Sequence, residues 1–342
     1  MEERKRIEWI DYAKVIGIWL VVLGHILNAG RPIESELHTL IYSFHMPFFF
    51  FVSGLLFSTK DMGFGAFAVS KIKSLIVPYI LLNVLCLILS IPIYLYPDVF
   101  PTTNLHTLTE DLPTLLDGEF GCVFAPPSWF LITLFFVMLI SYFVTKLNIW
   151  WQVLVVALAI AMTYVAVIYQ FPLNIDTIPG AFVFFIIGQM LKERVRDINM
   201  NGWLLLLLSI SILIVYSCLA LFNGPVQINH IFGRTSWLFW IVAMIGIGGL
   251  YILANMKASL HTHTHTHTAR QVLQLISGGT ILILCLHETL INYTIDFFLV
   301  NHSFHIPLVM REIMLSIAIV LICVPIIWVI RRYLPIMLGN RK

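Results

Sequence analysis

Charged residues are scarce in this chain. They make up 11% of its 342 residues, against about 25% in typical soluble domains, whereas hydrophobic residues make up 59%. A soluble fold of this length cannot bury so much apolar surface in its core, so the composition excludes an ordinary water-soluble enzyme. A membrane protein can use that surface, because the lipid-facing side of every helix is also apolar. The composition therefore predicts an all-α integral membrane protein.

Metal-ligand motifs, a leader cleavage site and a large net charge are also missing. The five cysteines have no metal-ligand spacing, and the histidines outside one repeat lack patterns such as His-Glu-x-x-His, so we expect no catalytic metal. Arg4, Lys5 and Arg6 precede the first apolar run as they do in signal peptides. That run contains Lys14 and lacks a small-residue cleavage site, so we expect a retained helix. The net charge of +2 does not indicate a nucleic-acid partner.

Ten apolar runs are candidates to cross the membrane, which takes about 20 residues for a hydrocarbon layer of roughly 30 Å. They predict a single membrane domain over residues 1–342, a polytopic bundle of about ten transmembrane helices. The expected spans are 10–28, 37–58, 75–96, 128–146, 149–169, 178–191, 203–222, 234–254, 276–299 and 312–331.

The distribution of basic residues orients these spans. With a cytoplasmic N-terminus and ten alternating helices, both termini are cytoplasmic. Only Arg31, Arg234 and Arg311 then fall in or beside outer loops, and Lys14 lies in the first helix. The other 16 of the 20 Lys and Arg residues fall on the cytoplasmic side, as the positive-inside rule requires. We therefore expect a multi-pass protein of a bacterial inner (plasma) membrane, in contact with membrane lipid.

Two loops stand out between the expected spans. The longest outer loop, 97–127, contains several acidic residues and no Lys or Arg, and a loop of this length is often functional or partly ordered. The cytoplasmic loop 255–275 contains four His-Thr pairs at 261–268. These four histidines would suit loose metal binding, but a low-complexity expansion in a tolerant loop is the simpler explanation, and we favour it.

The first expected helix carries three ionisable residues, Asp11, Lys14 and His25. Such groups are costly inside a membrane unless they face a cavity or a partner, so each is a candidate functional residue. At about 100° per residue, Lys14 and His25 lie within about 20° of each other around the helix, and Asp11 lies within about 60° of Lys14. His25 lies roughly 16 Å further outward. The alternatives are that Lys14 snorkels to the interface and that His25 bonds a neighbouring helix.

The second expected helix carries two histidines and a proline. His38 and His45 are seven residues apart and share a face. Pro47 is expected to kink the helix and to free a carbonyl near His45. Ser53 and Gly54 allow close helix contact, which packing alone would also explain.

Other candidates are spread along the chain, and each has a simpler reading. Lys71 and Lys73 precede the third span and would hold an anionic group, or they would anchor the helix at the cytoplasmic interface. Trp129 begins the fourth span, as a substrate platform or as part of the interfacial belt. His287 and Glu288 interrupt the ninth span; they face a polar cavity or form an internal ion pair.

The run Asp11-Tyr12-Ala13-Lys14, followed after ten residues by His25, resembles the first signature of the membrane acyltransferase-3 family. The run 45–54, His-Met-Pro-Phe-Phe-Phe-Phe-Val-Ser-Gly, is similar to its second signature, especially in the branch related to fucose O-acetylases. Trp129-Phe130-Leu131 and His287 resemble later landmarks, and the ten-helix plan also fits. Many members carry Arg-x-x-Arg before the third helix, where this chain has Lys71 and Lys73.

The resemblance implies transfer of an acyl group, usually acetyl from acetyl-coenzyme A, to a hydroxyl of a surface glycan or lipid-linked sugar. It also implies that His25 is the essential catalytic residue. An imidazole, whose pKa is ordinarily near neutrality, suits a general base or a transient acyl carrier.

The residue chemistry divides the remaining candidates between donor and acceptor. Lys14, Lys71 and Lys73 would bind the phosphates of coenzyme A, with Asp11 holding Lys14 in place. Candidates on the acceptor side are His45, Ser53, Trp129, His287 and Glu288, with Ser53 or a backbone amide at the oxyanion.

A different class of function also fits the intramembrane Lys, His and Glu residues. They are the residue types of proton relays, so a proton-coupled secondary transporter is an alternative. The halves of the chain show no internal repeat, which weighs mildly against a transporter. A glycan-export membrane protein is a third reading and would need no acyl donor.

Overall fold

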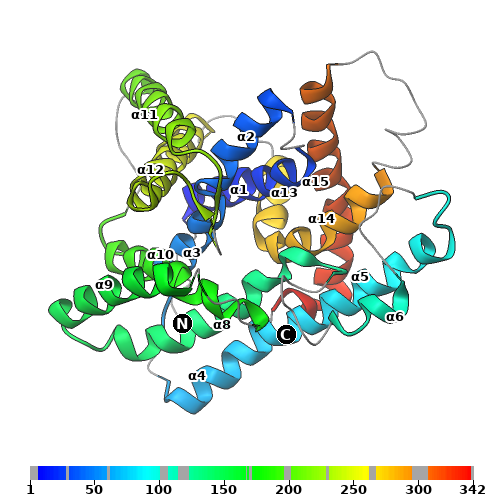
Figure 1. The fold of residues 1–342 in the computed structure, drawn as a ribbon, viewed down its shortest axis with the longest axis horizontal. Helices are drawn as coiled ribbons and strands as arrows, with labels where there is room; N and C mark the ends of the chain where they lie inside the picture. Colours follow the sequence, from blue (N-terminus) through cyan, green and yellow to red (C-terminus); the bar gives the residue numbers. More distant parts are fainter. Residues whose placement is uncertain are drawn as a thin grey trace. The chain divides into compact units, whose positions relative to one another are not determined.

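The computed structural model is helical almost throughout the residues that it describes, and the strands there are one two-residue pair (Figure 1). The described residues are 7–27, 31–59, 62–100, 107–114, 123–166, 168, 172–195, 202–228, 231–261, 267–294 and 307–339. The chain divides into two compact units, residues 1–56 with 184–280, and residues 57–183 with 281–342. The expectation of one domain over residues 1–342 stays a prediction.

Unit 1 is built around α1 (Glu8–Ile26), which packs against α12 (Ser236–His261), α13 (His267–Gly278), α3 (His45–Leu55) and α2 (Pro32–Tyr42). α11 (Gly202–Asn223) lies beside α12 (Figure 1). Between them the strands β1 (Val226–Gln227) and β2 (Ile231–Phe232) pair antiparallel. The core is aromatic: the buried Trp9 meets Tyr251 edge to face at 4.8 Å.

A close helix crossing joins α3 to α10 (Ile178–Leu191), whose residues from Phe184 onward belong to unit 1. A Cβ added at Gly54 would lie 1.9 Å from the carbonyl oxygen of Phe185. A Cβ added at Gly188 would lie 2.1 Å from the carbonyl oxygen of Phe51. The expected close contact at Gly54 is confirmed, and only glycine allows it on either helix.

Unit 2 contains α4 (Phe64–Lys71), α5 (Val77–Leu95), α8 (Trp129–Val144), α9 (Ile149–Ala166), α14 (Thr280–Thr294) and α15 (Leu308–Tyr333). Shorter pieces join them: η1 (Ile72–Ile76), α6 (Leu108–Asp111), η2 (Pro126–Ser128), η3 (Pro172–Thr177) and η5 (Pro335–Leu338). α8 packs against η1, η3 and α4, and η5 packs against α5, α15 and η1.

Eight helices of the described chain are long and apolar enough to cross a membrane, and α13 with α14 add a ninth if they form one broken span. α9 and α11 bury only 11% and 17% of their apolar stretches inside the protein. Helices that are apolar all round and so exposed require lipid to cover them. The predicted class, an all-α multi-pass membrane protein, is confirmed.

The second expected span, 37–58, is two eleven-residue helices, α2 and α3, because the chain breaks at Ser43 and Phe44. The expected kink at Pro47 is therefore misplaced. Pro47 is the third residue of α3, in the first turn, where a missing N–H costs nothing and no preceding turn is available to clash.

The third expected span begins earlier than residue 75, because α4, η1 and α5 run as one stretch of 32 residues, Phe64–Leu95. η1 is a π-helical turn, and Pro78 follows it directly. The wider turn removes the steric conflict that a proline ring has with the carbonyl four residues before it.

Both expected loops contain helix. In the outer loop 97–127, the described part holds α6, whose Asp111 is buried and accepts a hydrogen bond of 2.7 Å from the Tyr94 hydroxyl. In 255–275, α12 continues to His261 and α13 starts at His267, so the expected loop is mostly helical. Residues 101–106 and 115–122 of the outer loop, and 262–266 of the repeat, lie outside the described residues.

Candidate functional site

The signature residues Asp11, Lys14 and His25 lie on α1, a single uninterrupted helix. Gly17 and Gly24 are seven residues apart on one face of this helix, and neither has a side chain to keep a neighbouring helix away. A Cβ at Gly17 would lie 2.7 Å from the Phe48 ring of α3, and one at Gly24 would lie 3.1 Å from the Tyr42 ring of α2. The glycines thus let α2 and α3 approach α1 beside His25.

At the N-terminal end of α1, one residue of α13 binds both members of the Asp-x-x-Lys motif. The hydroxyl of Ser277 donates to Asp11 Oδ1 at 2.5 Å. The backbone carbonyl of Ser277 accepts from Lys14 Nζ at 2.5 Å. Asp11 and Ser277 are buried and Lys14 is half-buried. Asp11 and Lys14 therefore share the face of α1 that packs on α13.

An ion pair extends this contact toward the surface. Arg270 of α13 donates to the Glu8 carboxylate in the first turn of α1, and both side chains are about half exposed. An exposed pair of this kind adds little to stability. The bonds of Ser277 are buried, so we expect each of them to contribute more to the contact between the two helices than this exposed pair does.

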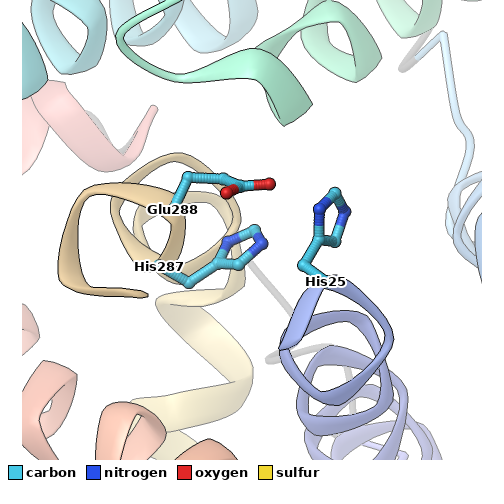
Figure 2. A group of neighbouring side chains, drawn as sticks. All are labelled: His25, His287 and Glu288. Atoms are coloured by element: carbon cyan, nitrogen blue, oxygen red, sulfur yellow. The ribbon is translucent and has the colours of Figure 1, made fainter. Parts of the chain in front are cut away.

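At the other end of α1, His25 lies in the last turn (Figure 2). An aromatic cluster of α2 and α3 lies beside it. The centre of the Tyr42 ring lies 3.8 Å from that of His38, in a stacked arrangement, and 4.7 Å from that of His45. The His25 ring centre lies 6.1 Å from Tyr42. Tyr42 thus contacts one histidine on each side of the helix break, His38 and His45, and lies near His25 of α1.

The break also fixes the state of His45. Its Nδ1 lies 2.9 Å from the carbonyl oxygen of Ile41, which can only accept, so Nδ1 carries the hydrogen. In the neutral ring the lone pair is then on Nε2. His45 thus bonds back across the break to the last turn of α2.

Ser53 is also bound within its own helix. Its hydroxyl donates to the carbonyl oxygen of Phe49 at 2.7 Å. This is the usual bond of a helical serine to the residue four positions before it. The proton of Ser53 is therefore directed at the backbone of α3.

In unit 2, His287 and Glu288 leave α14 from neighbouring positions (Figure 2). His287 is fully buried, and its Nδ1 donates to the carbonyl oxygen of Ile283 at 2.9 Å. Glu288 is half-buried. His287 therefore has the same tautomer as His45, with the Nε2 lone pair turned away from its own helix.

The other candidates of unit 2 are Trp129, Lys71 and Lys73, which lie at or near helix ends. Trp129 is the half-buried first residue of α8, directly after the buried Ser128, which accepts from Asn83 Nδ2 at 3.1 Å. Lys71 ends α4 with its Nζ 5.1 Å from the centre of the Phe67 ring, and Lys73 is exposed in η1. π-Helical turns often occur at functional sites.

A family model described as an acyltransferase domain, acyltransferase-3, matches residues 7–332. The chain belongs to the acyltransferase-3 family. Comparison with curated proteins and with solved structures found no match. With its membrane-spanning helices, this acyltransferase-3 protein is a multi-pass membrane acyltransferase. The resemblance seen in the sequence is confirmed for the family, and the fucose O-acetylase branch stays a prediction.

Two residues of this acyltransferase were missed by sequence reasoning, Ser277 and Tyr42. Ser277 is 263 residues from Lys14, and a serine before two glycines has no signature of its own. Tyr42 had a weak signal: it lies between His38 and His45, which were expected to share a face. Both histidines contact its ring although the helix breaks between them.

Proposed function

We propose that this acyltransferase moves an acetyl group from acetyl-coenzyme A to a hydroxyl of a surface glycan or lipid-linked sugar. The observation that carries the proposal is the organisation of α1. One end holds a cation anchored by a neighbouring helix, and the other end holds an imidazole beside an aromatic cluster.

The donor suits the spacing of Lys14 and His25. Eleven residues of continuous helix separate them by roughly 16 Å. Coenzyme A carries its phosphates at one end of a long pantetheine arm and the reactive thioester at the other. Lys14 would bind the anionic end from the cytoplasmic side, and Lys71 and Lys73 are further candidates for its phosphates. The thioester would then reach the level of His25.

The reaction needs a base for the acceptor hydroxyl. His25 takes the proton from that hydroxyl while the oxygen attacks the thioester carbonyl. The tetrahedral intermediate collapses, the C–S bond breaks, and the thiolate of coenzyme A takes the proton from His25. The products are the acetyl ester and free coenzyme A. An acetyl-histidine intermediate would give the same products in two steps.

The acceptor would bind around the outer half of α1. The stacked rings of Tyr42 and His38, both half-buried, offer aromatic surface that suits the apolar face of a sugar. His45 is a further candidate beside them. Trp129, His287 and Glu288 of unit 2 are further candidates for contact with the acceptor.

The test is consumption of labelled acetyl-coenzyme A by the purified protein in lipid nanodiscs, with donor binding measured in parallel. The variant is His25→Ala, and the matched control is His302→Ala, a histidine that is not among the candidate site residues. We expect turnover by the wild type and the control, with loss of at least about a hundredfold in His25→Ala.

Each result separates a part of the proposal. Normal turnover in His25→Ala would refute the role of His25. Absence of any binding of coenzyme A thioesters to the wild type would refute the donor and favour the transporter reading. Substrate-driven proton flux in vesicles would then be measured directly.

A further inference from the structure

We propose that the junction of α4 and α8 binds the headgroup of an anionic phospholipid, with Lys146 as its principal cation. The junction lies within unit 2, where the two helices pack against each other. Two features support the site: the length of one helix, and two lysines that lie against aromatic rings. The site goes beyond the proposed function, because it involves neither the acyl donor nor the acceptor.

The length of the third span places α4 at the level of the lipid headgroups. The stretch Phe64–Leu95 has 32 residues, which is about 48 Å of helix at 1.5 Å per residue. The hydrocarbon layer is only about 30 Å thick, and the 19 residues of α5, Val77–Leu95, nearly fill it. The start of the stretch therefore extends into the headgroup region, on the side predicted to be cytoplasmic.

Two lysines near this level contact aromatic rings in the same way. Lys71 follows Phe67 by four residues, and its Nζ lies 5.1 Å from the centre of that ring. Lys146 follows Tyr142 by four residues, and its Nζ lies 3.7 Å from the centre of that ring. The two ring centres are 5.1 Å apart, so both cations belong to one cluster that spans α4 and α8.

Lys146 is well placed to bind a phosphate. It is exposed and lies just beyond the end of α8 at Val144. The Tyr142 ring faces one side of the ammonium group, which has three N–H donors. A phosphate on the open side can accept charge-assisted hydrogen bonds from it. Because the ring already restrains the side chain, binding costs less side-chain entropy than it would for an unrestrained lysine.

The surface around Lys146 suits a lipid better than a soluble anion. Phe64 and Phe143 are 40% and 54% exposed, and their ring centres lie 4.8 Å apart. Aromatic rings at the headgroup level pack well against the glycerol and the upper acyl chains. The described residues 62–76 and 141–151 contain three lysines and no Asp or Glu. Basic side chains at the cytoplasmic end of membrane helices attract anionic lipids.

The experiment is native mass spectrometry of the full chain in detergent, titrated with phosphatidylglycerol or with the zwitterionic phosphatidylcholine. It counts the bound lipids and gives their dissociation constants. We expect one phosphatidylglycerol to bind more tightly than phosphatidylcholine. Lys146→Gln should raise the Kd of phosphatidylglycerol about fivefold, the loss expected for one cation at a lipid surface.

Two control variants separate a built site from general attraction. Lys146→Arg keeps a cation that can lie against the Tyr142 ring, so it should bind phosphatidylglycerol like the wild type. Arg194→Gln removes an exposed cation of unit 1 on the same predicted side of the membrane, and it should leave the Kd unchanged.

Three results would overturn the proposal. The first is equal affinity of the wild type for the two lipids. The second is an equal loss in Lys146→Gln and Arg194→Gln, because the cations would then act only through the general field of the protein. The third is release of the lipid by coenzyme A, which would assign the cluster to the donor phosphates. Consumption of acetyl-coenzyme A, which tests the proposed function, is a separate measurement, so the two proposals can fail independently.

Discussion

Replacing Gly54 by alanine should strongly destabilise unit 1, although it adds only one methyl group. The added Cβ would lie 1.9 Å from the carbonyl oxygen of Phe185, whereas ordinary van der Waals contact begins at 3.4 Å. The obstacle is backbone, so no rotamer change relieves it. Helices α3 and α10 would have to separate by about 1.5 Å, with loss of contacts along the whole crossing.

The expected cost is about 3 kcal/mol or more, at the upper end of overpacking penalties. It should appear as a fall of roughly 5–10 °C in the melting temperature of the detergent-solubilised protein. Gly188→Ala should behave alike, because its Cβ would lie 2.1 Å from the carbonyl oxygen of Phe51.

The matched control is Gly248→Ala in α12, where an added Cβ meets nothing within 4 Å. It should be neutral, or should stabilise the helix by about 0.5–1 kcal/mol through the better helix propensity of alanine. The reasoning would be refuted if Gly54→Ala melted with the wild type, or if all three variants lost the same stability.

Three further predictions concern polar and aromatic contacts. Tyr42→Ala should lower turnover by about tenfold or more, because the His38 and His45 rings lose the ring between them. Tyr42→Phe keeps that ring and should keep most of the activity. Equal turnover in the two variants would contradict this role of Tyr42. Asn223→Ala should lower the free energy of unfolding by about 2 kcal/mol, because the Asn223 side chain binds the Phe232 carbonyl and the Thr235 N–H at the β1–β2 hairpin. An unchanged melting temperature would argue against that role. Arg270→Gln should change the free energy of unfolding by less than about 1 kcal/mol at any salt concentration, because the ion pair of Arg270 with Glu8 is exposed. A large loss of stability that depends on salt would contradict this.

The membrane helices could be predicted from the sequence because their signal is local. Runs of about 20 apolar residues identified α1, α8, α9, α11, α12 and α15 closely. The spacing of Asp11, Lys14 and His25 also gave their placement on one helix. The resemblance of the first two motifs was sufficient for the family.

Features that depend on competition between local rules were predicted less well. Pro47 indicated a kink, but its place in the first turn of α3 moved the break to Ser43 and Phe44. The third span was expected to begin at residue 75, but it begins at Phe64, because the π-helical turn before Pro78 accommodates the proline ring within a longer helix.

Long-range partners left no trace in the local sequence. Ser277 meets Asp11 and Lys14 only because α13 packs on α1. Ser277 was expected at the start of the ninth span, 276–299, and the sequence analysis did not foresee α13 as a separate helix that packs on α1.

The π-helical turn η1 also changes what a one-residue deletion would do. Such turns behave as a single residue inserted into an α-helix. They therefore rotate the side chains of all following residues around the helix axis without interrupting the helix. Upstream, α4 keeps its contacts with α8, and downstream, α5 keeps its contacts with η5. Removing one residue from 72–76 would restore a regular helix but rotate one of these faces by about 100° away from its neighbour. The π-helical turn thus sets the rotation between α4 and α5, so that one continuous helix packs against neighbours on two different sides.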